Sequence, residues 1–445
     1  MVSSAEKGDD TMINVNDFNG HNDNEIIENA INNKDSDGII LIPPRASEND
    51  PERSMWILDR AILIPENTTI VLENCKIKLS DKCRDNFFRT ANCGMGIENP
   101  EKIHNVHIKG IGYCVLEGAD HPRASGDGTK ILAKPCPYTD EDLCKYAYWV
   151  PEDRKKSGKL SFDDKHGYSY GTDAGKDGES QYGDWRGIGI LFANTDVFSI
   201  ENVKIVTSHG WGISLEACTN GRVEKICFDA CMSKEIDGML HNMENQDGID
   251  VRNGCHDIII SDITGRTGDD LIALTAIARD DVPYRPGGSL GTTHVMHNNW
   301  KTRDRNIHDI IIRNVKGYSH LCFLIRLLPA GAKIWNVVID GVIDTTPDEI
   351  EAFGGIILGD CGIYGENLPD SIANVTISNV ICNRPKAVSA EGYVTDSVIC
   401  NIINRRKNCC AVQIQREDAL KNTQISNLTT VGAEPILEIF NKSEY

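Results

Sequence analysis

Short segments in which apolar and polar residues alternate recur along most of the chain. Asn or Asp opens each segment, three apolar or alternating residues follow, and Asn, Asp or Gly then precedes Val or Ile. A period of two that ends in a polar turn residue predicts a short strand with one buried face. The segments are NVHIKGI from Asn105, NVKIVTS from Asn202, DIIISDI from Asp257, DIIIRNV from Asp309, NVVIDGV from Asn336 and NVTISNV from Asn374.

Second strands of the same kind lie between these segments and read GISLEA, GIDVRN, LIALTA, FLIRLL and GIILGD. Strand pairs that repeat with Gly and Asn corners are typical of a stacked solenoid, in which each coil buries its apolar side chains against the next coil. We therefore predict an all-β fold: a single-stranded, right-handed parallel β-helix, whose hand follows from the bias for right-handed crossovers between parallel strands.

The first 50 residues have a different pattern. They predict an amphipathic helix from about Asn24 to Asn32, followed by a buried strand that ends at Pro43. The open end of a solenoid exposes strand edges, so we expect this N-terminal region to form a helical cap on a single domain that covers 1–445. Insertions at 119–185, which is rich in aromatic residues, and at 276–306 are expected to border a binding groove.

Two strands carry aspartates at the same place. In the segments NQDGIDV and GDDLIAL, stacking Ile249 on Ile272 places Asp247 over Asp270, one coil away in sequence. Neighbouring parallel strands lie about 4.8 Å apart, so these carboxylates are expected to be neighbours, with Asp269 beside them. Either motif alone could be an ordinary tight turn. Their coincidence on consecutive coils favours a site.

The same register brings other side chains to this row. It places Trp211 and, one coil earlier, Arg186 in the column of Asp247, and it directs Arg326 outward in the column of Asp250. We expect these residues, together with Asp250, to bind substrate. Trp211 is interpreted either as a stacking platform for a sugar or as a corner residue of the core.

Clustered carboxylates repel one another, so we expect one of them to keep its proton while another stays ionised. Inverting glycoside hydrolysis needs this division, because one carboxylic acid protonates the leaving oxygen while a carboxylate activates water. The row therefore predicts a glycoside hydrolase that acts on an oligo- or polysaccharide.

At these residues the chain resembles the polygalacturonase family, glycoside hydrolase family 28, of the pectate-lyase-like β-helix class. The Asn-Thr-Asp motif of that family matches Asn245, Gln246 and Asp247, and its paired aspartates match Asp269 and Asp270. The resemblance implies that Asp269 is the general acid and that Asp247 and Asp270 activate water. It also implies that Asn245 lies among the substrate-binding residues.

The resemblance covers about 110–342, together with the N-terminal cap, and departs from the family at two motifs. The basic Arg-Ile-Lys motif matches only at Arg326, because Leu328 stands in place of the lysine. The Gly-His-Gly motif is absent, and His294 in GSLGTTHVMH is the candidate replacement. These departures, with the aromatic insertion, favour an exo-acting enzyme on a short oligosaccharide.

Two other functions fit the same residues. A polysaccharide lyase or epimerase that acts on uronides would use aspartates to hold calcium and a basic residue to take a proton. A non-catalytic glycan-binding β-solenoid would use the row for recognition alone. A lyase product carries a new double bond that absorbs ultraviolet light, whereas a hydrolase product does not.

The formal net charge of -20 argues against nucleic acid or an anionic membrane as the partner, since both require a cationic surface. A carbohydrate is the expected partner, and a homo-oligomer is left open. With no apolar leader or membrane-spanning run, we expect a cytoplasmic protein, or a secreted one if a leader has been removed.

The 16 cysteines are scattered, and many lie in apolar strand patterns, which favours buried reduced thiols over disulfides. Cys227 with Cys231, or Cys409 with Cys410, would need a second pair at suitable spacing to bind zinc. We therefore expect no metal or other cofactor.

Overall fold

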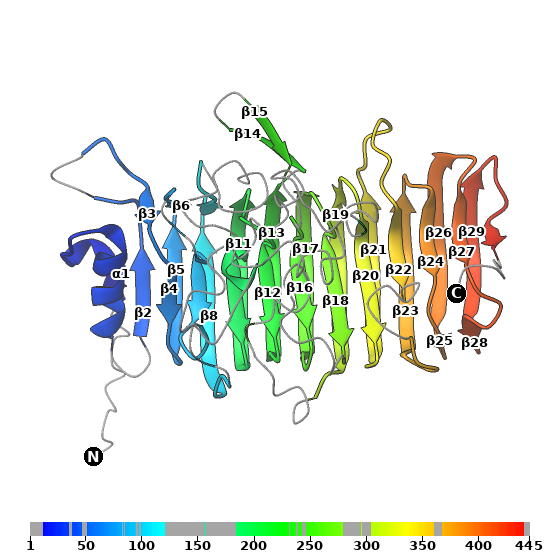
Figure 1. Cartoon of the computed structure of the whole chain (residues 1–445), viewed down its shortest axis with the longest axis horizontal. Coiled ribbons are helices and arrows are strands. Elements are labelled where there is room, and N and C mark those ends of the chain that lie inside the picture. Colours follow the sequence, from blue (N-terminus) through cyan, green and yellow to red (C-terminus); the bar gives the residue numbers. More distant parts are fainter. Residues whose placement is uncertain are drawn as a thin grey trace, which may run out of the picture.

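The computed structural model describes residues 12–34, 38–46, 51–81, 83, 85–94, 97, 99–120, 156, 184–230, 232–236, 239–242, 246–278, 295, 304–359 and 367–439. In this part the chain winds into coils that stack along one axis, and Figure 1 shows their strands side by side in chain order. Almost every strand pairs in parallel with strands of neighbouring coils, so the predicted parallel β-helix is confirmed.

The coils contribute to two long sheets of 17 and 11 strands. The larger sheet contains β1 (Ile13–Asn14), β2 (Gly38–Ile42), β3 (Trp56–Leu58), β5 (Thr68–Glu73), β6 (Lys76–Leu79), β8 (Ile103–Ile111), β9 (Val115–Glu117), β11 (Thr195–Val206), β13 (Thr219–Asp229), β17 (His256–Thr267), β19 (Ile307–Ser319), β21 (Ile334–Asp344), β23 (Ile372–Cys382), β25 (Val394–Thr395), β26 (Val398–Lys407), β28 (Leu420–Lys421) and β29 (Gln424–Val431). The smaller sheet contains β4 (Ile62–Ile64), β7 (Phe88–Thr90), β10 (Ile190–Ala193), β12 (Ile213–Glu216), β16 (Ile249–Arg252), β18 (Ile272–Ile277), β20 (Phe323–Ala330), β22 (Gly354–Leu358), β24 (Lys386–Ala390), β27 (Cys410–Ile414) and β30 (Ile436–Glu438). An antiparallel hairpin of β14 (Ser233–Ile236) and β15 (Met239–Asn242) projects from the stack (Figure 1).

Asn and Asp residues bend the long strands of the larger sheet. Asp309, Asn336 and Asn374 have φ angles of 56, 54 and 54°, in the left-handed region that Asn and Asp adopt more readily than other non-glycine residues. On successive coils, the Asn374 amide donates to Asn336 Oδ1 at 3.1 Å, and the Asn336 amide donates to Asp309 Oδ1 at 2.8 Å. The polar residue that opens each of these segments is therefore a bend stabilised by a ladder of side chains.

Aliphatic side chains stack in register inside the coils. Ile249, Ile272, Ile325 and Ile356 pair in turn across β16, β18, β20 and β22, and all four are fully buried. Burying one such side chain contributes roughly 1.5 to 3 kcal/mol. Each coil gains this energy only from its neighbours, which is why the stack folds as a unit.

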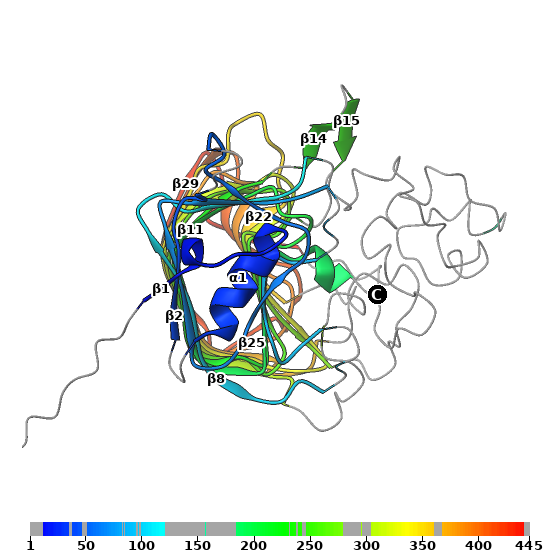
Figure 2. The same ribbon diagram turned by 90° about the vertical axis from the view of Figure 1, so that its left-hand side faces the viewer.

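A helix covers the N-terminal end of the stack, as predicted. α1 (Asp23–Asn32), preceded by the 3-10 turn η1 (Val15–Asp17), begins at Asn22, whose side chain accepts a hydrogen bond from Glu25 N at 3.0 Å. Its apolar face, including the fully buried Ile27, packs on β2, β3 and β4. Figure 2 looks onto this end and shows α1 lying across the coils.

Every cysteine in the described ranges is free, which confirms the prediction of reduced thiols for that part of the chain. Several thiols donate to a carbonyl oxygen of the preceding coil, such as Cys218 to Phe192 and Cys255 to Leu215, both at 3.3 Å. The same ranges contain no helix long and apolar enough to cross a membrane.

Candidate functional site

The aspartates are brought together by the pairing of β16 with β18. Ile249 pairs with Ile272, as the sequence register predicts. Just before these strands, Gly248 N donates to Asp270 O at 2.9 Å. Asp247 and Asp270 therefore begin adjacent coils side by side.

Gly248 allows the two coils to approach this closely. A Cβ atom at this position would lie 2.3 Å from Leu271 O and 3.1 Å from the ring of Phe228. The contact with Leu271 O is too short for any side chain, so the glycine maintains the spacing between the coils that carry Asp247 and Asp270.

Gln246 joins three consecutive coils at the same place. Its side-chain amide donates to Ser208 O at 2.6 Å, and its main-chain oxygen accepts from Gly268 N at 3.0 Å and Asp269 N at 3.3 Å. The residue is fully buried. It therefore fixes the backbone on which Asp269 stands, relative to the preceding coil.

Three of the four aspartates are buried. Asp247, Asp250 and Asp270 are 8%, 2% and 4% exposed, whereas Asp269 is half-buried. Removing a carboxylate from water is costly unless its charge is neutralised or paired. The row therefore carries a cost in folding stability that the ordinary corners of the solenoid do not.

Asp270 is the best-paired member of the row. Its Oδ2 lies 2.8 Å from Arg326 Nε, and its Oδ1 accepts a hydrogen bond from Phe323 N at 2.8 Å. Its own backbone N donates to Asp269 Oδ1 at 2.9 Å. Because Ala273 pairs with both Asp250 and Arg326, the arginine lies in the column predicted for it.

Burial and mutual repulsion hold protons on the row. Burial raises the pKa of Asp270 to about 6, although Arg326 acts against the rise. Burial, followed by the charges of Asp269, Asp250 and Asp270, raises the pKa of Asp247 well above its ordinary value. Burial likewise raises the pKa of Asp250, and Arg252 offsets only part of that effect. Asp247, Asp250 and Asp270 therefore cannot all be ionised at mildly acidic pH.

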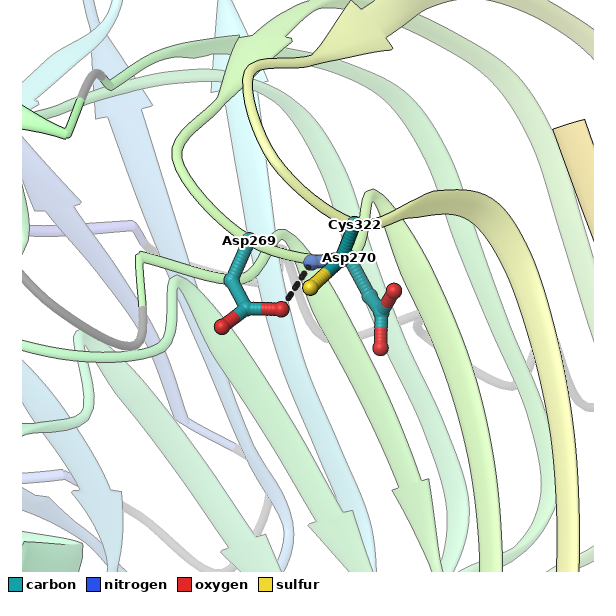
Figure 3. A group of neighbouring side chains, drawn as sticks. All are labelled: Asp269, Asp270 and Cys322. Carbon is teal, nitrogen blue, oxygen red and sulfur yellow. Dashed lines mark hydrogen bonds between the residues drawn. The ribbon is translucent and has the colours of Figure 1, made fainter. Parts of the chain in front are cut away.

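Cys322 approaches the aspartate pair from the next coil, as Figure 3 shows. One oxygen each from Asp269 and Asp270 and the Cys322 sulfur lie within 4.8 Å of one another. This spacing could suit a metal ion, but Arg326 already pairs with Asp270. In addition, burial and the two carboxylates raise the pKa of the Cys322 thiol, which disfavours a thiolate ligand. We assign no metal to this cluster.

Arg252 is a site residue that the sequence analysis missed. It is fully buried, and its guanidinium carbon lies 4.7 Å from the ring centroid of Trp211. Burial lowers its pKa, while Glu216 and Asp250 act in the opposite direction. The signal was present, since Arg252 stands two residues after Asp250 and so points to the same side of β16.

Trp211 lies in the predicted column, because Gly212 N donates to Asp247 O at 2.9 Å. The indole is 8% exposed and packs in an apolar cluster with Trp185 and Leu191. With Arg252 over one face of its ring, this placement favours the corner residue over the stacking platform.

The column predicted for Arg186 is wrong. Ile190 pairs with Ile213, so Ile188 occupies the position next to Trp211. Arg186 lies two residues earlier, in the 3-10 turn η4 (Asp184–Gly187), and is buried. A shift of two residues preserves the alternation of a strand, so the pattern alone could not distinguish the two registers.

Both long insertions are anchored on the coils that carry the site. At the first residue of the first insertion, Ala119 N donates to His209 Nε2 at 3.0 Å, and within the second, Val295 N donates to Glu216 Oε2 at 3.0 Å. The remaining predicted site residues, Asn245 and His294, lie outside the described residues, as does most of both insertions.

No protein-family model and no curated protein matches the chain. Among solved structures, the polygalacturonase from Erwinia carotovora ssp. carotovora is similar over 98% of this chain and 98% of its own, with a TM-score of 0.50 and 13% identity. A tailspike double mutant of the E. coli bacteriophage HK620, in complex with a pentasaccharide, matches over 97% of this chain and 66% of its own (TM-score 0.50, 13% identity). The Streptococcus pneumoniae surface protein and adhesin PfbA matches over 97% and 100% (TM-score 0.48, 12% identity). At these identities the likeness shows the β-helix fold alone.

Proposed function

We propose that the protein is a glycoside hydrolase that cleaves a glycosidic bond in an oligo- or polysaccharide. One observation carries this proposal: Asp247 and Asp270 stand side by side on adjacent coils, with Asp269 and Asp250 next to them and Arg326 paired to Asp270. Such a group supplies both a proton donor and a carboxylate that activates water. The fold, which this chain shares with a polygalacturonase, is compatible with that chemistry.

Asp269 is assigned the role of general acid. It is the least buried of the four aspartates, so a leaving oxygen can reach it. Oxygens of Asp269 and Asp270 lie within 4.8 Å of each other, which is less than the roughly 6.5 to 9.5 Å between the carboxyl groups of inverting enzymes. Asp247, on the adjacent coil, is therefore needed to activate water together with Asp270.

The raised pKa values suit these roles. A general base works best when its pKa lies near the working pH. Asp270, with a pKa of about 6, becomes a base above that pH while Arg326 stabilises its charge. Asp247 has its pKa raised in the same direction, so it holds a proton at low pH and releases it as the pH rises. Activity is expected to fall below about pH 6.

Exo action on a short oligosaccharide is part of the proposal. Leu328, two residues beyond Arg326, is buried in an apolar cluster with Ile277 and Ala330. This cluster offers no cation at the position of the family's lysine. Together with the insertions anchored beside the row, it favours a confined site over one that accepts a long uronide chain.

A glycan-binding solenoid is the second candidate. It is favoured by the low exposure of Asp247, Asp250 and Asp270 and by a tailspike of the same fold that was solved with a bound pentasaccharide. A lyase or epimerase fits less well, because its calcium ion would have to displace Arg326 from Asp270.

The chemistry is tested by incubating the wild-type protein with plant and microbial oligosaccharides, both uronic and neutral. A hydrolase produces new reducing ends without ultraviolet absorbance, and proton NMR of the first product shows inversion at the anomeric carbon. Retention would contradict the assigned roles. Absorbance that grows with product would replace the hydrolase by a lyase, and binding without turnover would leave the solenoid as a receptor.

A further inference from the structure

A buried arginine from two coils away holds the turn that faces the aspartate pair. Arg384 is fully buried and lies just before β24. Its guanidinium donates to Ser319 O at 3.0 Å, Cys322 O at 2.6 Å and Gly354 O at 3.0 Å. Three carbonyl oxygens on two different coils are thus bound to one planar group.

Asp344 fixes this arginine in place. Its Oδ2 lies 3.4 Å from Arg384 Nε, and both side chains are fully buried. The same carboxylate accepts hydrogen bonds from Asn383 N at 2.7 Å and Thr346 N at 2.9 Å. A buried charge pair with these additional donors is rigid, since either member would be costly to leave alone.

The turn held by Arg384 carries the groups that contact the aspartates. Phe323 N donates to Asp270 Oδ1 at 2.8 Å, and the Cys322 sulfur lies within 4.8 Å of oxygens of Asp269 and Asp270. Arg384 binds the carbonyl oxygen of Cys322, and Phe323 is the next residue along the chain. A displacement of the turn would therefore move the two aspartates relative to Asp247.

We propose that Arg384 is a positioning residue for the aspartate pair: it clamps the turn at 319–323, so that Phe323 N stays on Asp270 and the Cys322 thiol stays beside Asp269. The reaction it serves is the proposed hydrolysis. The clamp itself is a property of the folded chain that can be measured without a substrate.

The positive charge of Arg384 adds a second effect. Burial has the largest influence on the pKa of Asp270 and raises it, and the charge of Asp269 acts in the same direction. Three groups lower this pKa by favouring the ionised form: Arg326, Phe323 N and Arg384. Asp247 and Asp250 also repel the charge of Asp270, since the like charges of these carboxylates raise one another's pKa. Removing the Arg384 charge is expected to make Asp270 a weaker acid.

Arg384→Lys and Arg384→Met in the full-length chain separate the two effects. Both substitutions remove the three-carbonyl fork, whereas only the lysine keeps the charge. Arg406→Met is the matched control, because Arg406 donates to Ile350 O at 3.2 Å and does not bind the turn. Amide hydrogen exchange of the peptide covering 319–328 reports the turn, and carbon NMR of labelled aspartates, with Asp270→Asn to identify the signal, reports the pKa of Asp270.

Both Arg384 variants should show exchange at least about tenfold faster in this peptide, because the carbonyls lose their donors. The pKa of Asp270 should rise in the methionine variant and return toward the wild-type value in the lysine variant. With a substrate in hand, kcat should fall about 10- to 100-fold in both variants, and the acidic limb of the pH profile should move upward only in the methionine variant.

Unchanged exchange of this peptide in a folded Arg384→Lys variant would overturn the clamp. An unchanged Asp270 titration in a folded Arg384→Met variant would overturn the charge effect. If Arg384→Met fails to fold, the lysine variant alone decides on the exchange rate of the turn. If the wild-type protein turns over no substrate, the proposed hydrolysis fails, and the exchange measurement still decides whether the clamp exists.

Discussion

Aspartates recur on both sheets of the solenoid, but their surroundings are opposite. On the larger sheet, Asp309 is exposed and Asp340 is half-buried. Each accepts hydrogen bonds from a neighbouring coil, chiefly from Asn336 and Ser378 respectively, and these lower the pKa of each carboxyl. Next to the smaller sheet, Asp247, Asp250 and Asp270 are buried among like charges, and their pKa values are raised.

The difference separates a structural column from a functional one. A ladder whose members satisfy one another stabilises the stack and needs no further explanation. A column of buried carboxylates costs stability, and such costs are retained mainly where they serve binding or catalysis. Substitutions that are matched between the two columns should therefore have opposite effects.

The largest expected contrast is between Asp247→Asn and Asp309→Asn. Asp247→Asn should lower kcat by about 10²- to 10⁴-fold, because it removes a group that activates water. It should also leave the free energy of unfolding at pH 7 unchanged or higher, since a buried charge is removed. Asp309→Asn should leave turnover unchanged. Turnover and thermal unfolding are measured for both variants. Equal losses of activity in the two variants would show that the columns do not differ in function.

Breaking the ion pair of the site should cost more than breaking any ladder contact. Arg326→Met leaves Asp270 buried without its guanidinium, and the free energy of unfolding at pH 7 should fall by about 3 to 5 kcal/mol. The double variant Arg326→Met/Asp270→Asn should recover much of this loss, because no charge is stranded. Equal destabilisation of the single and double variants in urea would show that packing, not charge, holds this pair.

The two columns should also respond to pH with opposite signs. Asp270 has a pKa of about 6 when folded against an ordinary 3.8. The folded state binds the proton of Asp270 more tightly than the unfolded state does. Protonation therefore adds about 3 kcal/mol to the free energy of unfolding below pH 4, and this stabilisation is lost as the pH rises through 6. The pKa of Asp309 is lowered, so its contribution is present above pH 4 and is lost as pH falls. Urea unfolding of the wild-type protein, Asp270→Asn and Asp309→Asn at several pH values measures how the stabilisation by each aspartate changes with pH. Changes of the same sign for both aspartates would contradict the difference between the two columns.

The smallest effect is expected within the ladder. Asn336→Ala removes the hydrogen bonds to Asp309 and from Asn374 and places alanine at a φ of 54°. The expected loss is about 1 to 2 kcal/mol, with no change in kcat. A loss of activity at constant stability would assign the ladder a role in the reaction.

The fold could be predicted because its signal is repeated many times. Each strand pair carries the same alternation, so a wrong strand assignment in one coil does not change the predicted fold. The register of Asp247 on Asp270 was also predictable, since Ile249 and Ile272 are separated by one uninterrupted coil.

Register failed where the pattern is degenerate. Arg186 was displaced by two residues, which alternation cannot detect. In the larger sheet, Asn202 belongs to a different bend from Asn336, five residues further along the strand, although both open the same kind of segment. Two similar bends in one strand look alike in sequence.

Contacts between coils that are not adjacent could not be predicted from the sequence. No residue after Leu328 was predicted to belong to the site, yet Arg384 from that segment binds the turn beside Asp269 and Asp270. The alternation along β16 places Arg252 on the same side as Asp250, but only the stacking of the coils reveals its contact with Trp211.

Whether the row of aspartates catalyses hydrolysis is decided by the turnover of wild-type protein and Asp269→Asn on the oligosaccharide panel, read as new reducing ends, with unfolding curves for both proteins. We expect hydrolysis by the wild-type protein and a rate about 10²- to 10⁴-fold lower in the variant at unchanged stability. Equal rates in the two folded proteins would contradict the claim that this row of aspartates carries the chemistry.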